Sequence, residues 1–399
     1  MSARSGIPAF EVMRVIDAVV ARRATGLPVF DLSAGQPSTP APTTVRAAAA
    51  RAIGADRLGY TNALGIPALR AAIARHYLRT DDLDVPAGSV AVTTGSSGGF
   101  LLAFLAAFDP GDTVVMARPG YPAYRNMLAA LGCTVLELGC GPETRFQPTA
   151  AQLDALPVAP AGIVLASPAN PTGTMVAPAE LAAITAWCDL RGVRLVSDEI
   201  YHGISYTEPA VSAWRFSRSS IVVNSFSKYF SMTGWRAGWL LVPDELLDAV
   251  DRLAGNFTIC PPALSQVAAV AAFDAYDELD ANVLRYKSNR DLLLSRLPTI
   301  GLDQLAPADG AFYVYADVSR WTDDSLGFAA RLLAETGVAV APGVDFDPVD
   351  GGRFIRMCFA GDTAEIDRAV DLLGDWLPHQ LRSSHPGAHN ARRPPLATA

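Results

Sequence analysis

Three short apolar runs in the middle of the chain each lead into polar residues. The runs cover residues 163–166, 193–196 and 221–223, and the polar residues that follow them are Asn170, Asp198 and Lys228. These polar residues lie about 30 positions apart, a spacing that suits successive strands of one α/β sheet. Ligands of open α/β sheets bind at the carboxyl ends of the strands, so we expect the three side chains to converge on one crevice.

Strands and helices also alternate on either side of this region. Toward the N-terminus the pattern predicts a helix around residues 12–19, a strand at 29–33, helices within 47–78, a strand at 89–94, a glycine-serine turn at 95–99, a buried helix at 100–108 and a strand at 113–117. This β-α-β order implies a parallel sheet. Further along, helical runs at 245–253 and 263–297 precede strands at 310–317, 338–341 and 353–359 of a smaller domain.

Composition and charge narrow the classes of function. The 399 residues are 50% hydrophobic and 18% charged, as in a soluble globular protein. A net charge of −8 argues against nucleic acid and acidic membrane surfaces as partners, so we expect a small ligand. The longest apolar run is too short to span a bilayer, and no signal peptide is recognisable. Five scattered cysteines, without disulfide or metal-ligand spacing, favour the cytoplasm and no metal site.

The segment after the third apolar run carries the most distinctive chemistry. Lys228 follows the small hydroxyl residues Ser225 and Ser227, and Arg236 lies eight positions later among glycines. Taken alone, such a lysine is more often a surface or core-edge residue. Together with Asp198 and Asn170 it suggests another use, because an amine that can form an imine, a buried carboxylate and an amide donor bind and tune pyridoxal phosphate.

These segments give the chain a resemblance to a known family. The sequences SFSKYFSMTGWRAG, SPANPTG and SDEIY resemble the motifs of fold type I pyridoxal-phosphate-dependent aminotransferases, class I/II, of the aspartate aminotransferase superfamily, and the resemblance covers about residues 28–377. It implies an α/β fold with a large, mostly parallel seven-stranded sheet domain, helices on both faces, and a smaller α+β domain. The boundaries that we expect are 1–46 for an N-terminal arm and part of the small domain, 47–284 for the large cofactor domain, 285–378 for the C-terminal small domain and 379–399 for a disordered tail.

The resemblance assigns roles around the ring of the cofactor. Lys228 would hold pyridoxal 5'-phosphate as an internal aldimine and then shuttle the substrate's proton, and Asp198 would keep the pyridine nitrogen protonated. Asn170 and Tyr201 match the donors to the phenolic oxygen, and Tyr121 matches the aromatic that stacks on the ring. The alternatives to these cofactor roles are purely structural: Asp198 as a helix cap, Asn170 as a turn residue and Tyr121 as a core residue.

A phosphate group would bind at the glycine-serine turn of residues 95–98, which lies between the expected strand at 89–94 and the expected helix at 100–108. Backbone N–H groups between a strand and a helix N-terminus face anions well. The candidate cofactor ligands at this end are Gly95, Ser96, Ser97, Gly98, Ser225, Ser227 and Arg236. Tyr60 resembles the tyrosine that reaches the phosphate from a neighbouring subunit, so the resemblance also implies a homodimer.

Substrate recognition is likewise expected from the resemblance. Arg356 matches the arginine that clamps the substrate α-carboxylate, for which a lysine is a poor replacement, and Gly35 and Asn170 match positions beside it. The chain departs from some dicarboxylate-specific members, which have a lysine where this chain has Gly98, and a second arginine for a side-chain carboxylate is not apparent. We therefore expect a neutral, aliphatic or aromatic donor. Cys358 replaces a more usual Ser or Asn, which we do not interpret.

The expected activity is a ping-pong exchange of an amino group between an α-amino acid and a 2-oxo acid. A lyase acting by β-elimination or carbon-sulfur cleavage, or a racemase, on the same cofactor remains the main alternative. Residues 95–99 also satisfy the G-x-S-x-G pattern of serine hydrolases with Ser97 as nucleophile, but His202 is the one later histidine outside the C-terminal region. A non-catalytic cofactor-binding regulator is disfavoured because no DNA-binding extension precedes Pro28.

Overall fold

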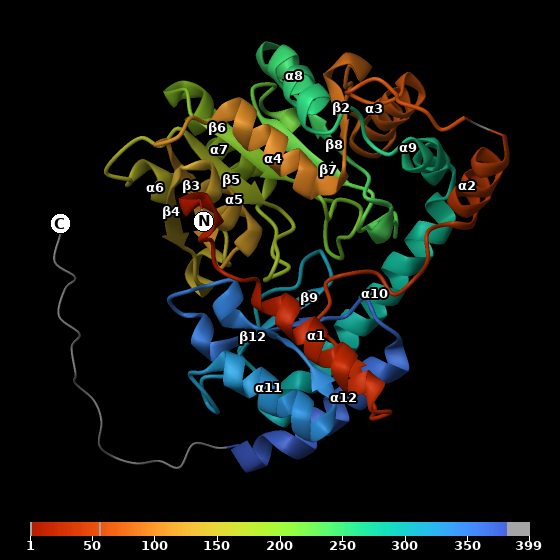
Figure 1. Cartoon of the computed structure of the whole chain (residues 1–399). Coiled ribbons are helices and arrows are strands. Elements are labelled where there is room, and N and C mark those ends of the chain that lie inside the picture. The colour runs from red at the N-terminus through yellow and green to blue at the C-terminus, as the bar shows by residue number, and fades with distance from the viewer. Residues whose placement is uncertain (1, 56, 381–399) are drawn as a thin grey trace.

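The computed structural model describes residues 2–55 and 57–380. Figure 1 shows a larger part, above, built on one extended sheet, and a smaller part, below, that contains α1 and the C-terminal helices. We call these parts the large and small domains. The long helix α10, Tyr276–Arg296, runs from one domain into the other.

The large domain is organised around a seven-stranded sheet of order β2-β8-β7-β6-β5-β3-β4. Six strands run parallel, and β8 is antiparallel to both of its neighbours. The strands are β2 (Val90–Thr93), β8 (Gly238–Leu241), β7 (Ile221–Ser225), β6 (Arg194–Asp198), β5 (Gly162–Ala166), β3 (Thr113–Arg118) and β4 (Thr134–Gly139). The predicted seven-stranded, mostly parallel sheet is confirmed, and the three apolar runs are the adjacent strands β5, β6 and β7.

Helices cover both faces of this sheet, which explains why its strands are apolar without alternation. In β5, Val164 packs against the helices on one face of the sheet, whereas Ile163 and Leu165 pack against the helices on the opposite face. The first face is covered by α4 (Gly95–Ala107), α5 (Pro122–Leu131) and α8 (Leu247–Phe257), and the second by α6 (Ala150–Asp154) and α7 (Pro178–Arg191). At the β2 and β8 edge lie α2 (Thr43–Ala55), α3 (Pro67–Asp81) and α9 (Ala263–Val270).

The small domain holds a three-stranded antiparallel sheet of order β11-β12-β9 and a separate parallel pair, β1 and β10. Its helices are α1, α11 and α12, and the N-terminal end of α1 lies at the boundary with the large domain in Figure 1. The elements are α1 (Glu11–Ala24), β1 (Phe30–Asp31), β9 (Tyr313–Asp317), α11 (Ser325–Thr336), β10 (Val338–Ala339), β11 (Ala341–Pro342), β12 (Phe354–Cys358) and α12 (Thr363–Trp376).

Two local predictions differ from the structure, and a third falls almost wholly on residues outside the described part of the chain. Residues 95–99 were expected to form a turn but begin α4, because Gly95 reverses the chain with a φ of 75° and the helix continues directly from it. The strand expected at 338–341 is divided into β10 and β11, which pair with different partners. The predicted tail, 379–399, lies outside the described residues except for its first two, which end the short 3-10 helix Leu377–Gln380.

No helix within the described part of the chain is both long and apolar enough to cross a membrane.

Candidate active site

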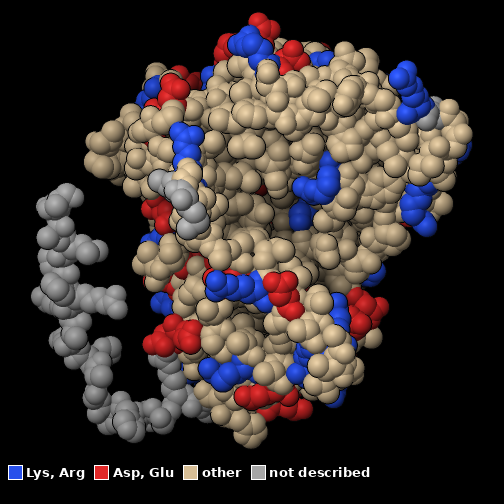
Figure 2. Space-filling view, in the orientation of Figure 1, with Lys and Arg blue, Asp and Glu red and all other residues tan. Residues whose placement is uncertain are grey.

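A cavity of about 680 Å³ lies between the two domains, at the carboxyl ends of the central strands. Figure 2 shows the corresponding hollow near the centre of the molecule, with basic side chains at its right-hand edge. The predicted residues that line this cavity are Gly35, Ser96, Ser97, Tyr121, Asn170, Asp198, Tyr201, Ser227, Lys228, Arg236 and Arg356. The structure thus brings Asn170, Asp198 and Lys228 together in one cavity, as we predicted from their positions at or after the ends of β5, β6 and β7.

Lys228 places a buried amine in the cavity. It lies just beyond β7, and its Nζ donates to the backbone oxygen of Gly35 at 2.6 Å. Burial is the main reason that the pKa of Lys228 is lowered to about 8; Arg356 acts in the same direction, and Cys358 and Asp198 act in the opposite one. About a tenth of the amine is therefore unprotonated at pH 7, far more than for an ordinary lysine.

Asp198 is a buried carboxylate at the last position of β6, with 3% of its surface exposed. The hydroxyl of Tyr124 donates to one carboxylate oxygen, and the backbone N–H of Ile200 donates to the other at 3.1 Å. Burial raises the pKa of Asp198 to about 6 despite these hydrogen bonds and the nearby Lys228. A cationic group in the cavity would therefore be a favourable partner for this carboxylate.

The guanidinium of Arg356 is held in place from several sides. Nη1 donates to the Oδ1 atom of Asn170 at 2.9 Å, and Nη2 donates to the backbone oxygen of Ser33 at 2.6 Å. Its carbon lies 4.4 Å from the ring centre of Tyr313 and 4.8 Å from that of Phe346. The buried Nε has no hydrogen-bond partner among the described residues. Arg356 is thus a fixed cation with hydrogen-bonding capacity to spare, which suits a carboxylate.

Tyr201 forms a second fixed group in the cavity. Its hydroxyl lies 2.7 Å from the hydroxyl of Tyr313, and both tyrosines are buried. Burial raises the pKa of each phenol, that of Tyr201 to well above its ordinary value. Both hydroxyls therefore stay protonated, and one of them can donate to an oxygen in the cavity while the other donates to its neighbour.

The start of α4 carries groups that could bind an anion. The first N–H groups of a helix have no partner within it, and Ser96 and Ser97 bring their hydroxyls to the same wall. A Cβ atom built on Gly95 would lie 2.5 Å from Nη2 of Arg236, so glycine leaves space that the guanidinium fills. The combination of free amides, hydroxyls and one guanidinium suits a phosphate group.

Four predicted residues do not line the cavity. Gly95 and Gly98 lie in α4 behind its first-turn hydroxyls, and Ser225 is buried, where its hydroxyl donates to that of Ser227 at 2.9 Å. Tyr60 is 83% exposed and lies away from the cavity of its own chain. Gly95, which has no side chain, and the buried Ser225 can therefore support the cavity wall without a side-chain contact to a ligand.

Several residues of the cavity were missed in the sequence. Tyr124 and Tyr313 contribute the hydroxyls described above, and α1 and the residue before it contribute an apolar wall. The wall consists of Phe10, Val12, Met13 and Ile16. A signal existed for Tyr124, because it lies three positions after Tyr121, the residue that precedes α5, and residues at this spacing near a helix start can lie on one side. We find no comparable signal for Tyr313.

Neither a histidine paired with Ser97 nor a group of metal ligands is found in the described part of the chain. Both ring nitrogens of His202 are directed elsewhere, with Nε2 at 3.1 Å from the backbone oxygen of Ser167 and Nδ1 at 3.7 Å from Glu199. His202 is therefore not paired with Ser97 as a hydrolase would require. Within residues 2–55 and 57–380, no cluster of three or more potential ligands could hold a metal ion.

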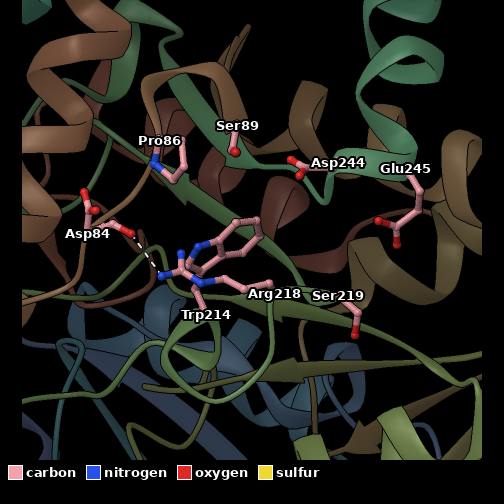
Figure 3. A pocket seen from close by; sticks show the side chains of 8 residues that line it. All are labelled: Asp84, Pro86, Ser89, Trp214, Arg218, Ser219, Asp244 and Glu245. Carbon is pink, nitrogen blue, oxygen red and sulfur yellow. Dashed lines mark hydrogen bonds between the residues drawn. The ribbon is translucent and has the colours of Figure 1, made fainter.

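A second cavity, of about 450 Å³, lies at the opposite end of the large sheet (Figure 3). Ser89 and Ser219 lie just before β2 and β7, so this cavity is at the amino ends of parallel strands. The guanidinium of Arg218 lies 5.3 Å from the ring centre of Trp214 and donates to the backbone oxygen of Asp84 at 2.9 Å. Its lining contains no lysine and none of the predicted catalytic residues.

Comparisons with known proteins agree with this geometry. The model of the family described as aminotransferase class I and II matches residues 28–373. A valine–pyruvate aminotransferase of Mycobacterium tuberculosis is 59% identical over 381 residues, which cover 94% of this chain and 98% of that protein. An aspartate/prephenate aminotransferase of Thermus thermophilus is 33% identical and covers 88% of this chain and 91% of its own. The crystal structure of an aminotransferase from M. tuberculosis matches with a TM-score of 0.94 and 58% identity, over 95% of this chain and 99% of that one.

Proposed function

The chain belongs to the aminotransferase class I and II family, and we propose that it transfers the amino group of valine to pyruvate with pyridoxal 5'-phosphate as its cofactor. The observation that carries this proposal is the grouping of Lys228, Asp198, Arg356 and the anion site in one cavity. The choice of valine and pyruvate is supported by the 59% identical relative, which is named for these substrates.

The residues of the cavity fit pyridoxal phosphate at each of its polar groups. The start of α4 and Arg236 would bind its phosphate, Asp198 its ring nitrogen, and Lys228 its aldehyde carbon covalently. The hydroxyl of Tyr201 would donate to its phenolic oxygen. When bound, the cofactor supplies a ring that accepts the electron pair left on a substrate carbon after a proton is removed.

The protein's own groups would then bind the substrate and move the proton. Arg356 would bind the carboxylate that the amino acid and the 2-oxo acid share, so one site can serve both halves of a ping-pong reaction. Lys228, with a pKa lowered to about 8, would take the proton from the substrate α-carbon as a free amine and return it from its ammonium form. Asn170 and Ser33 hold the guanidinium of Arg356 during both halves.

An apolar donor is favoured by the lining of the cavity. Its cationic side chains are those of Lys228, Arg236 and Arg356, all of which have other roles in this proposal. A donor with a side-chain carboxylate would therefore lack a partner for its second charge. Phe10, Val12 and neighbouring side chains of α1 instead offer apolar surface, which suits the branched side chain of valine.

We propose that two copies of the chain associate through the surface that carries Tyr60. Phe257 and Ile259 are 59% and 51% exposed, and their segment adjoins that of Tyr60, because the N–H of Thr61 donates to Sγ of Cys260 at 3.4 Å. Exposed apolar side chains gathered in this way are typical of an interface. Tyr60 would reach the phosphate end of the partner's cavity.

The proposed location is the cytoplasm. Five cysteines, four of them buried, are free thiols in the structure. Free thiols are usual in a reducing compartment.

The activity is tested by incubating the purified protein with pyridoxal phosphate, valine and pyruvate. Transfer predicts alanine and 3-methyl-2-oxobutanoate in equal amounts. Release of ammonia with no alanine would instead indicate the lyase alternative, and formation of the D-amino acid would indicate a racemase. Aspartate is the comparison donor, and a higher kcat/KM with aspartate than with valine would contradict the proposed specificity.

The attachment residue can be tested cleanly because the chain has two lysines, Lys228 and Lys287. Lys287 is 48% exposed and pairs with Asp291 at 2.8 Å, so it is a matched internal control. Borohydride reduction in the presence of pyridoxal phosphate is expected to label Lys228 and to spare Lys287. We expect Lys228→Ala to abolish transfer and Lys287→Ala to retain it, whereas normal turnover in Lys228→Ala would overturn the assignment.

A further inference from the structure

The first turn of α1 is capped by a residue more than 300 positions away. The residue before the helix, Phe10, makes no side-chain capping bond. Instead, the carboxylate of Asp345 accepts the N–H of Val12 at 2.9 Å and the N–H of Glu11 at 3.2 Å. Asp345 is 4% exposed. A buried carboxylate is thus committed to two backbone donors that would otherwise lack partners at this helix end.

This helix end forms part of the wall of the active-site cavity. Phe10, Val12 and Ile16 line the cavity and also belong to one apolar cluster with Phe346. The ring of Phe10 meets that of Tyr121 edge to face, with centroids 5.9 Å apart. The position of the first turn therefore sets where these apolar atoms lie in the cavity wall.

The segment that carries Asp345 is itself anchored to the large domain. Its neighbour Phe346 accepts the N–H of Gly120 at 3.0 Å, and Asp347 pairs with Arg118 at 2.8 Å. The ring of Phe346 also supports Arg356 at 4.8 Å. Residues 345–347 therefore tie α1 to the same framework that positions the carboxylate-binding arginine.

We propose that Asp345 is a positioning residue for donor specificity, which holds the first turn of α1 so that Phe10 and Val12 contact the branched side chain of the donor. This inference rests on the proposed transfer from valine. Loss of Asp345 should affect valine more than alanine, because the wall contacts the two methyl groups that extend beyond the alanine side chain. A residue needed only for folding would affect both donors alike.

The test compares Asp345→Ala with Asp362→Ala. Asp362 is a matched control because it caps α12 through the N–H groups of Ala364 and Glu365, at 2.9 and 3.2 Å, and does not line the cavity. The half-reaction with each donor alone is followed by stopped-flow absorbance. We expect the ratio of kcat/KM for valine over alanine to fall about tenfold in Asp345→Ala, as for two apolar groups no longer buried. The control should keep the wild-type ratio.

Hydrogen exchange supplies a readout that does not need activity. Amide protection at the start of α1 should fall about tenfold in Asp345→Ala, as for a lost helix cap, while Asp362→Ala should affect α12 alone. An unchanged donor ratio together with looser α1 would overturn the specificity role, and unchanged protection would overturn the positioning. If wild-type protein transfers nothing from valine, the proposed function fails, whereas the exchange result still tests the cap.

If Asp345→Ala does not fold, Asp345→Asn keeps one acceptor oxygen at the same site and Phe10→Ala removes the wall side chain directly. Both should lower the ratio of valine to alanine activity. A wild-type ratio in both variants would overturn the proposal.

Discussion

Replacing Tyr124 by phenylalanine removes one hydroxyl and leaves the ring packing in place. That hydroxyl donates to Asp198, the carboxylate proposed to pair with the ring nitrogen of pyridoxal phosphate. Asp198 keeps its second hydrogen bond, from the N–H of Ile200 at 3.1 Å. The bond to Tyr124 stabilises the ionised carboxylate and lowers the pKa of Asp198, so its loss should raise that pKa above its present value of about 6.

The expected magnitude follows from the strength of a hydrogen bond to a charged group. At the lower limit of about 1.5 kcal/mol, the pKa of Asp198 rises by about one unit. Pairing with a cationic ring needs the ionised carboxylate, so cofactor affinity is retained above the pKa and lost as pH falls through it. At pH 6 the ionised fraction drops about fivefold in the variant, and above pH 8 the two proteins differ by less than about twofold.

The assay is a titration of the cofactor-free protein with pyridoxal phosphate at pH 6 and pH 8.5, followed by absorbance. Tyr315→Phe is the control, because Tyr315 is also buried but its hydroxyl has no partner within the described part of the chain. We expect a lower affinity at pH 6 in Tyr124→Phe alone. Equal affinities of wild type and Tyr124→Phe at pH 6 would refute this account of how Asp198 is tuned.

Three further substitutions test other parts of the structure. Arg356→Lys should raise the KM for valine and the KM for pyruvate by about 100-fold each, because lysine cannot make the bidentate contact with a carboxylate. Steady-state kinetics measures both values, and a rise in only one of them would contradict a shared carboxylate site. Gly95→Ala should weaken cofactor binding by about tenfold or more, since its Cβ would lie 2.5 Å from Arg236 at a φ of 75°; binding titration checks this, and wild-type affinity would count against the anion site. Phe328→Ala, at a side chain with no exposed surface, should lower the free energy of unfolding in urea by about 3–5 kcal/mol, against less than about 0.5 kcal/mol for Leu284→Ala at an exposed position.

The central sheet and its crevice could be predicted because both depend on short stretches of consecutive residues. Strands buried on both faces must be continuously apolar, and the residues that follow them fall at one edge of the sheet. Asp198 and Lys228 were therefore correctly placed in one crevice from their positions alone. The start of α4 was wrongly predicted as a turn, because glycines are typical of turns. Gly99 instead allows the helix to pack closely against β8, since a Cβ atom at this position would lie 3.1 Å from Leu240.

The side chains that hydrogen-bond to Asp198 and to α1 could not be predicted in the same way, because they come from elements distant in sequence. Tyr124 donates to Asp198 from α5, and Asp345 accepts from the start of α1, 333 positions earlier in the sequence. Such contacts depend on how helices pack against the sheet and how the two domains meet, which strand and turn patterns do not specify. It follows that a substitution can leave every recognisable motif intact and still alter the reaction. Changes on the buried face of α5 should shift the pKa of Asp198, and changes in residues 345–347 should alter the choice of donor.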